Sequence, residues 1–172
     1  MKQLLNIREA NAADVEDIFR LLEMYVNAGT VLKRSREDIL FYIGNFVAAE
    51  FDGRMCGCCA VRDFGNNLLE VRSLVVDPQY HGKGIGRAML EAIISGLKLH
   101  RETWRLFTLT KEPGFFRKLG FQDVEKEVFP EKIWSDCSQC PKFNCCDEVA
   151  LLLTSESKLQ KNCSADIDKC VQ

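Results

Sequence analysis

The stretch HGKGIGRAML at residues 81–90 constrains the fold more than any other part of this chain. It follows LLEVRSLVV, a strand-like run at 68–76, and an Asp-Pro turn, and its apolar residues continue at helical spacing to Leu97. Glycine weakens a helix by about 1 kcal/mol relative to alanine, so three glycines at a helix start need an offsetting interaction. A phosphate approached by backbone N–H groups is the usual one. The sequence therefore predicts a strand, a phosphate-binding turn and a helix in succession.

Two widespread phosphate-binding patterns do not fit this stretch. The Walker pattern needs an earlier glycine and a hydroxyl residue after the lysine, and Gly82-Lys83 has neither. The dinucleotide pattern Gly-x-Gly-x-x-Gly follows a first strand, whereas Gly82, Gly84 and Gly86 are evenly spaced and lie in mid-chain.

The rest of the chain predicts a single mixed, mostly antiparallel α/β sheet flanked by helices. The expected elements begin with a strand at 3–9, a helix that starts at Asn11 and Asp14 and is ended by Gly29, and a helix capped by Ser35 and Asp38 that runs to about Ile43. A hairpin at 46–51 and 55–61 with an Asp52-Gly53 tight turn follows, then strands at 68–76 and 106–110, a short helix from Pro113 to Gly120, and a last strand at 148–153. Residues 1–154 read as one domain with an irregular cysteine-rich segment at 130–146, followed by a polar tail at 155–172.

Charge and hydropathy give no indication of a nucleic-acid or membrane partner, although composition leaves open a local basic patch. Lys and Arg number 23 against 25 Asp and Glu, so no net basic field recruits nucleic acid or an anionic membrane. The N-terminus is too polar for a signal peptide and no apolar run reaches spanning length. We expect a cytoplasmic protein that acts on small molecules, with a homodimer left open.

VVDPQYHGKGIGRAML resembles the acetyl-coenzyme A loop of the GNAT superfamily of N-acyltransferases, whose pattern is Gln/Arg-x-x-Gly-x-Gly/Ala. His81, Gly84 and Gly86 occupy the patterned places, with His81 a departure from Gln or Arg. The resemblance covers residues 5 to 153 and implies acetyl-CoA as cosubstrate. N–H groups of residues 82 to 87 would face the pyrophosphate, with charge added by Lys83 and Arg87.

GFFRKLGF at 114–121 looks like the second landmark of that superfamily, a short helix beside the coenzyme. The family commonly has a Tyr there that protonates the leaving thiolate. This chain has Phe116, so the usual acid is missing and water is the simplest proton source. The resemblance implies coenzyme contacts from the residues Leu74, Val76, His81, Gly82, Lys83, Gly84, Ile85, Gly86, Arg87 and Phe116.

Charged residues on the strand at 68–76 point to the chemistry. A period of two places Glu70, Arg72, Leu74 and Val76 on one face. Acetyl transfer needs a neutral amine, so a base must accept a proton first, and Glu70 is the candidate. The resemblance implies that the Val76 N–H polarises the acetyl carbonyl. The alternative is that Glu70 and Arg72 pair with each other or with neighbours.

Two further segments resemble the short bacterial form of N-acetylglutamate synthase, an amino-acid N-acetyltransferase. GTVLKRSREDILFYIGNFVAAEFDG is similar to its N-terminal Leu-x-x-Arg-Ser segment, and FPEKIWSDCSQCPKFNCCDEVALLL to its C-terminal Trp-x-Asp-Cys and Cys-Pro-Lys-Phe segment. A dicarboxylic amino acid needs cations, and Arg offers bidentate geometry. The candidates are Arg34 and Arg72 first, then Lys132 and Lys142, for which solvated surface charge is the alternative.

Nine cysteines are many for a reducing compartment. Cys137, Cys140, Cys145 and Cys146 could hold a structural zinc ion, remain free thiols or form a disulfide, and the spacing leaves these open. Cys56, Cys58 and Cys59 read as small core residues on a strand.

Three functions are consistent with these motifs. The resemblance favours acetylation of the L-glutamate α-amino group in arginine biosynthesis, by direct transfer in a ternary complex. The alternatives are a GNAT enzyme for another small amine and a non-catalytic acyl-CoA-binding thiol or metal sensor.

Overall fold

A computed structural model describes residues 4–158 of the chain. Seven strands form one mixed sheet in the order β1-β2-β3-β4-β5-β7-β6, mostly antiparallel, as the sequence predicted. The chain divides into two compact units, Met1–Arg62 with Val71–Leu97, and Asp63–Glu70 with Lys98–Gln172. The expectation of one domain over residues 1–154 stays a prediction.

The first unit is built on antiparallel strands at one end of the sheet order. β1 (Leu5–Glu9) pairs with β2 (Phe46–Phe51), which forms a hairpin with β3 (Arg54–Asp63). The predicted tight turn is confirmed, because Asp52 and Gly53 both have positive φ, 51° and 77°. β4 (Leu68–Val76) begins in the second unit and ends in the first.

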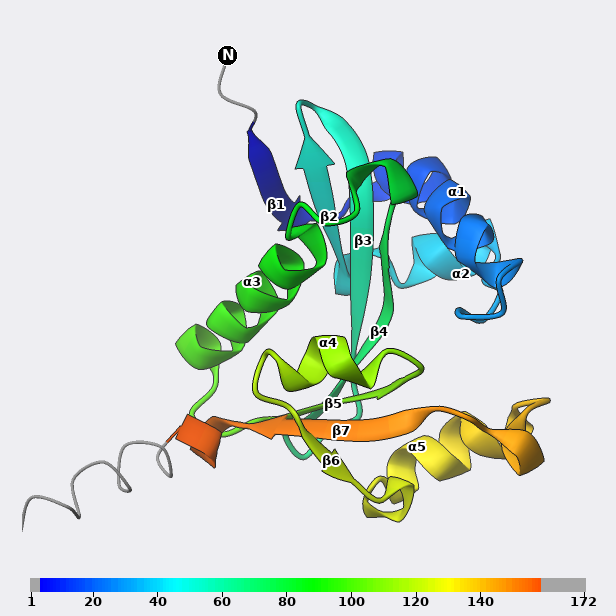
Figure 1. The fold of residues 1–172 in the computed structure, drawn as a ribbon, viewed down its shortest axis with the longest axis vertical. Coiled ribbons are helices and arrows are strands. Elements are labelled where there is room, and N and C mark those ends of the chain that lie inside the picture. Colours follow the sequence, from blue (N-terminus) through cyan, green and yellow to red (C-terminus); the bar gives the residue numbers. More distant parts are fainter. Residues whose placement is uncertain (1–3, 159–172) are drawn as a thin grey trace, which may run out of the picture. The chain divides into compact units, whose positions relative to one another are not determined.

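Helices cover both faces of these strands. α1 (Val15–Val26) and α2 (Arg36–Phe41) lie on one face and α3 (Ile85–His100) on the other (Figure 1). The predicted caps are confirmed: Asn11 and Asp14 form a capping box, and the Ser35 side chain accepts from the Asp38 N–H at 3.1 Å. α2 is shorter than expected, since a 3-10 turn follows it.

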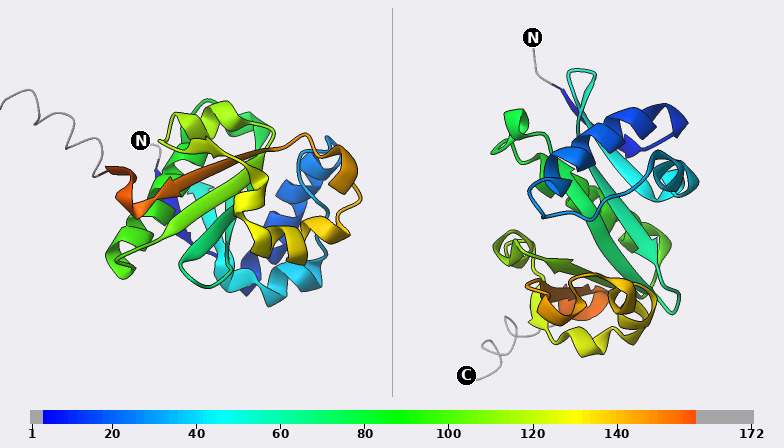
Figure 2. Two further views of the ribbon diagram at one scale, coloured as in Figure 1. Left: turned by 90° about the horizontal axis from the view of Figure 1, so that it is seen from below. Right: turned by 90° about the vertical axis from the view of Figure 1, so that its right-hand side faces the viewer.

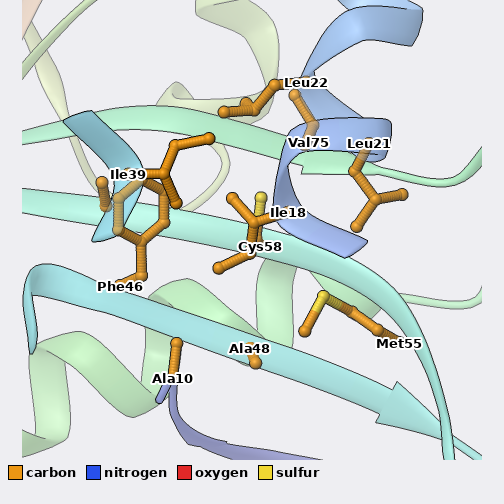
Figure 3. Close-up of a cluster of buried hydrophobic side chains, with 11 residues drawn as sticks. Ala10, Ile18, Leu21, Leu22, Ile39, Phe46, Ala48, Met55, Cys58 and Val75 are labelled. Atoms are coloured by element: carbon orange, nitrogen blue, oxygen red, sulfur yellow. The ribbon is translucent and has the colours of Figure 1, made fainter. Parts of the chain in front are cut away.

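The apolar stripe of α1 makes the core of this unit (Figure 3). Ile18, Leu21 and Leu22 of α1 and Ile39 of α2 cover Phe46, Ala48, Met55, Cys58 and Val75 of the strands. Each fully buried aliphatic side chain contributes about 1.5–3 kcal/mol relative to exposure. Cys56, Cys58 and Cys59 are fully buried, which confirms that they are core residues.

The second unit is a smaller layer of strands with short helices. β5 (Arg105–Thr110) runs parallel to the start of β4 and antiparallel to β7 (Val149–Thr154), which also pairs with β6 (Gln122–Val124). α4 (Pro113–Arg117) and α5 (Pro130–Ser135) lie on opposite sides of these strands (Figures 1 and 2). Phe107 of β5 stacks on Phe129, immediately before α5, with ring centroids 4.1 Å apart.

The cysteine-rich segment is more regular than predicted. Pro130 begins α5 because its fixed φ suits the first turn of a helix, and two 3-10 turns follow. The first residues of the expected polar tail form a further turn, and the rest of the tail, from residue 159, lies outside the described residues. The 3-10 turns are Ala12–Asp14, Ile43–Asn45, Pro78–Tyr80, Lys126–Val128, Cys137–Gln139, Phe143–Cys145 and Ser155–Lys158.

Candidate functional site

The predicted phosphate-binding turn joins β4 to α3. Gly82 and Gly84 both have φ of 76°, in the left-handed region that an L side chain rarely adopts. Nothing lies within 4 Å of a Cβ added at either position, so the need for glycine is conformational. The N–H groups of Ile85, Gly86 and Arg87 open α3, where a helix leaves its first amides without internal acceptors. Exposed amides at a helix start are suited to a phosphate, and contact of this loop with the pyrophosphate of a coenzyme stays a prediction.

β4 is interrupted before it reaches this turn. Ser73 has a φ of 54° inside the strand, and Val75 joins the core while Leu74 and Val76 are only half-buried. A strand broken by a residue in this conformation does not keep its two-residue alternation. The prediction that Glu70, Arg72, Leu74 and Val76 share one face is therefore wrong beyond Ser73.

The end of β4 is tied to α1 and to the loop. The Tyr25 hydroxyl, from α1, donates to the carbonyl oxygen of Val76 and lies 2.8 Å from His81 Nε2. His81 Nε2 is also 2.9 Å from the same carbonyl oxygen. The imidazole of His81 therefore contacts the end of the strand. Burial raises the pKa of Tyr25, and the negative charge of Asp77 raises it further.

The two cations predicted for the coenzyme loop have local partners. Lys83 Nζ lies 4.6 Å from the ring centroid of Phe51 and 5.1 Å from that of Tyr80. Arg87 Nε donates to Glu91 at 2.7 Å, one turn along α3, and both side chains are exposed. An exposed ion pair and exposed cation–π contacts each contribute only about 1 kcal/mol or less, so both cations can turn to a phosphate at little cost.

Arg34 is held in a fixed position before α2. Its Nε donates to Asp38 at 2.6 Å, and its guanidinium carbon lies 5.4 Å from the Phe46 ring centroid and 6.0 Å from that of Tyr42. The side chain is only 12% exposed. Since Asp38 uses one nitrogen, the other two remain on the guanidinium fork that matches a carboxylate. Arg72, the other predicted arginine, is half-buried on β4 in the same unit.

Glu70 and Lys132, both predicted site residues, form a buried ion pair in the second unit. Lys132 Nζ is 2.8 Å from Glu70 Oε1 and 2.8 Å from Asp136 Oδ2. Glu70 and Lys132 are buried, at 3% and 8% exposure. The ammonium group of Lys132 therefore contacts two protein carboxylates. The sequence left open whether Glu70 is a base or pairs with a neighbour, and the structure shows Glu70 paired with Lys132 of α5.

This pair belongs to a wider group of polar side chains. Burial raises the pKa of Glu148, against the opposing charges of Lys132 and Lys126. Burial also raises the pKa of Cys137, with Lys132 acting in the other direction. Cys146 Sγ donates to Glu148 Oε2 at 3.8 Å. One ammonium group, that of Lys132, therefore influences acidic groups contributed by three separate segments.

Comparison with known proteins identifies the family. An acetyltransferase (GNAT) domain matches residues 43–123. An uncharacterized N-acetyltransferase of Chlorobaculum tepidum is 41% identical over 151 residues, which are 86% of this chain and 95% of that protein. The chain belongs to the GNAT family of acetyltransferases. This GNAT enzyme is an acetyl-CoA-dependent N-acetyltransferase, as the sequence predicted.

Two relatives of this GNAT enzyme carry more specific names. The amino-acid acetyltransferase of Mycobacterium tuberculosis is 32% identical over 134 residues, which are 73% of this chain and 75% of that protein. The N-acetylglutamate synthase of Neisseria gonorrhoeae, solved with coenzyme A and N-acetyl-glutamate, has a TM-score of 0.79 at 28% identity. That match covers 90% of this chain and only 36% of the Neisseria chain.

The remaining predicted residues of this GNAT enzyme lie in the second unit. Phe116, at the family's tyrosine position, is 4% exposed and packs edge-on against Phe115 and Phe121. It fills the core under α4, and a contact with the coenzyme stays a prediction. Lys142 lies exposed before the turn Phe143–Cys145.

The four cysteines predicted as tentative metal ligands lie in the second unit as free thiols. Within residues 4–158, no group of three or more His, Cys, Asp or Glu side chains has the arrangement needed to hold a metal ion. The geometry of this segment therefore does not support the zinc hypothesis, because a structural zinc site requires four converging ligands. Over the same residues, no helix has the length and apolarity needed to cross a membrane.

Sequence reasoning missed Tyr25 and the two aspartates that pair with predicted cations, Asp38 and Asp136. Tyr25 had a signal, since it follows Ile18 and Leu22 on the apolar stripe of α1 with a hydroxyl at its tip. Asp38 and Asp136 each stand four residues after a predicted cation, the spacing of a helical ion pair.

Proposed function

We propose that this GNAT enzyme acetylates the α-amino group of L-glutamate with acetyl-CoA in one ternary complex, giving N-acetylglutamate for arginine biosynthesis. The observation that carries the proposal is the likeness to the Neisseria gonorrhoeae synthase solved with coenzyme A and N-acetyl-glutamate. The name of the Mycobacterium tuberculosis relative supports the same substrate class. The expected cytoplasmic location and homodimer stay predictions.

Arg34 is proposed to bind a carboxylate of glutamate. Its position is fixed by Asp38 and by the rings of Phe46 and Tyr42, so little side-chain entropy remains to be lost on binding. Arg72 is proposed as a second carboxylate ligand. Lys132 is a weaker candidate than the sequence suggested, because two protein carboxylates already surround its ammonium group.

Glu70 is proposed as the base that takes a proton from the glutamate amine, directly or through water. The neutral amine nitrogen then attacks the acetyl carbon, with the carbonyl oxygen polarised by the Val76 N–H. The carbon–sulfur bond breaks, and the coenzyme A thiolate leaves and takes a proton from water. The attacking nitrogen gives its second proton to the hydroxide left behind, so that one proton in total remains, on Glu70.

Substrate identity is tested by coenzyme A thiol release with the twenty amino acids supplied singly. We expect release with glutamate alone, and Arg34→Ala should raise KM for glutamate about 10- to 100-fold, the value of a charge-assisted bidentate contact. Arg36→Ala is the matched control, because Arg36 pairs with Glu16 and covers Phe19 of α1. Release with another amine would overturn glutamate as substrate, and coenzyme binding without any release would favour a sensor.

The role of Glu70 is tested against its ion pair. Glu70→Gln should lower kcat by about 10²- to 10⁴-fold if Glu70 is the base. Asp136→Asn removes the other carboxylate from the same ammonium group and should leave kcat nearly unchanged. Equal losses of activity and Tm in both variants would show that Glu70 serves only to neutralise Lys132.

A further inference from the structure

One peptide group, between Val76 and Asp77, connects β4 to the glycine loop and is held at both ends. Its carbonyl oxygen accepts from the Tyr25 hydroxyl and lies 2.9 Å from His81 Nε2. Its N–H, on Asp77, donates to the Cys56 carbonyl oxygen at 2.8 Å. A peptide group fixed at both polar ends cannot rotate, so the direction in which the chain enters the loop is set here.

Tyr25 and His81 act on the same acceptor. A carbonyl oxygen has two lone pairs, and with Nε2 protonated the imidazole donates toward this oxygen and toward the Tyr25 hydroxyl. Tyr25 reaches the peptide from α1, 51 residues earlier in the sequence. The two side chains thus link α1, the end of β4 and the first residue of the loop.

We propose that Tyr25 and His81 are positioning residues for the coenzyme: by holding the Val76–Asp77 peptide they fix the loop from Gly82 to Gly84 in the conformation that presents its amides to the pyrophosphate. The proposal rests on the proposed placement of acetyl-CoA on this loop. It also gives His81 a role different from the direct coenzyme contact that the sequence predicted, since Nε2 is engaged with the strand end.

The loop conformation depends on such an external restraint. Gly82 and Gly84 give the loop wide backbone freedom, and the residues from His81 to Gly84 are exposed. Ordering a mobile loop on binding costs free energy and so lowers the affinity for the coenzyme, whereas a loop that is already held in place avoids this cost. His81 is itself exposed, so its removal should loosen the loop without loss of core packing.

The test measures coenzyme A affinity by calorimetry, without acceptor, for Tyr25→Phe, His81→Ala and the double variant. Each single change should raise Kd about threefold to tenfold, the effect of losing one hydrogen bond. The Kd of the double variant should be only slightly higher than that of the single variant that binds coenzyme A more weakly, because both side chains hold the same carbonyl group. KM for acetyl-CoA should rise while KM for the acceptor stays unchanged, and His81→Gln, which keeps a donor, should restore most of the affinity.

Hydrogen exchange separates positioning from direct contact. In the protein without coenzyme, amides from Asp77 to Gly84 should exchange faster in both single variants than in the wild type. His100→Ala, at the far end of α3, is the matched histidine control and should change neither exchange nor Kd. Weaker binding in His81→Ala alone, with exchange unchanged in the free protein, would overturn the proposal in favour of a direct phosphate contact.

A separate variant tests the placement of the coenzyme. Gly84→Ala forces a side chain into the left-handed region and should weaken coenzyme A binding. If Gly84→Ala leaves Kd unchanged, acetyl-CoA does not bind this loop and the proposed placement fails. If Gly84→Ala weakens binding but Tyr25→Phe and His81→Ala do not, only the positioning role is overturned.

Discussion

Cysteine reactivity in this enzyme is decided residue by residue, by burial. Cys58 and Cys59 lie in the core of the sheet, and burial raises the pKa of both thiols. Cys145 is exposed at the end of a turn. The reactive form of cysteine is the thiolate. Burial therefore protects Cys58 and Cys59 from alkylation in two ways, because it raises the pKa of the thiol and makes the sulfur inaccessible to reagents.

We predict that iodoacetamide at pH 8 labels Cys145 in the folded enzyme and leaves Cys58 unlabelled. With a pKa of about 12, roughly one Cys58 thiol in ten thousand is ionised at pH 8, and this fraction rises tenfold per pH unit. Mass spectrometry of the labelled peptides measures both sites. A sample unfolded in urea is the control and should label at both, whereas labelling of native Cys58 as fast as Cys145 would contradict its burial.

Ser73 is a second feature at this scale, a non-glycine residue with positive φ inside a strand. A β-branched side chain fits this region worst, whereas Asn adopts it readily. Ser73→Val should lower the free energy of unfolding by about 1–2 kcal/mol, and Ser73→Asn should lower it less. Urea unfolding of both variants measures the difference, and a Val variant as stable as wild type would show that the strand tolerates regular geometry here.

At the scale of an element, two glycines at and within α3 differ in the backbone conformation that they adopt. Gly84 precedes the helix with φ of 76°, while Gly96 lies within it. Nothing lies within 4 Å of a Cβ added at either position, so neither substitution creates a clash. Backbone conformation alone therefore decides whether an alanine is tolerated at each position.

We predict that Gly96→Ala stabilises the enzyme by about 0.5–1 kcal/mol, because alanine loses less backbone entropy in a helix. Gly84→Ala should destabilise it by about 1–2 kcal/mol, since the left-handed region is strained for alanine. Thermal and urea unfolding measure both changes. Equal effects of the two substitutions would mean that the loop gives up its positive φ without strain.

At the scale of the whole molecule, the described residues include a packed core and a buried ion pair, and no cluster of side chains among them is suited to a metal ion. We predict that dialysis against EDTA leaves Tm and acetyl transfer unchanged. Loss of even about 1 kcal/mol would lower Tm by roughly 2–4 °C, which differential scanning calorimetry detects. Metal analysis before and after dialysis is the control, and stoichiometric zinc whose removal lowers Tm would revive the zinc hypothesis.

Much of the architecture could be predicted because its signals are local. The Asp52-Gly53 turn, the Asn11 and Ser35 caps and the apolar stripe of α1 each depend on residues a few positions apart. The glycine-rich turn before α3 was predicted from the same kind of evidence, whereas the left-handed conformation of Gly82 and Gly84 was not. Two local predictions failed, the irregularity of residues 130–146 and the regular alternation of β4, because a short helix and one Ser in an unusual conformation have no distinctive pattern.

By itself, the sequence predicted most of the strands and helices and the glycine loop, since hydrophobic period and turn chemistry act over short distances. The resemblance carried by that loop indicated the GNAT fold, whereas β6 and α5 were not predicted. Only the tertiary structure decided the partners of the site residues. Lys132 meets Glu70 from a helix far along the chain, and Tyr25 meets Val76 across 51 positions. Which charges and carbonyls converge at such separations depends on strand pairing and helix packing. Residue type shows what a side chain can do, and its neighbours after folding decide which of those roles it takes.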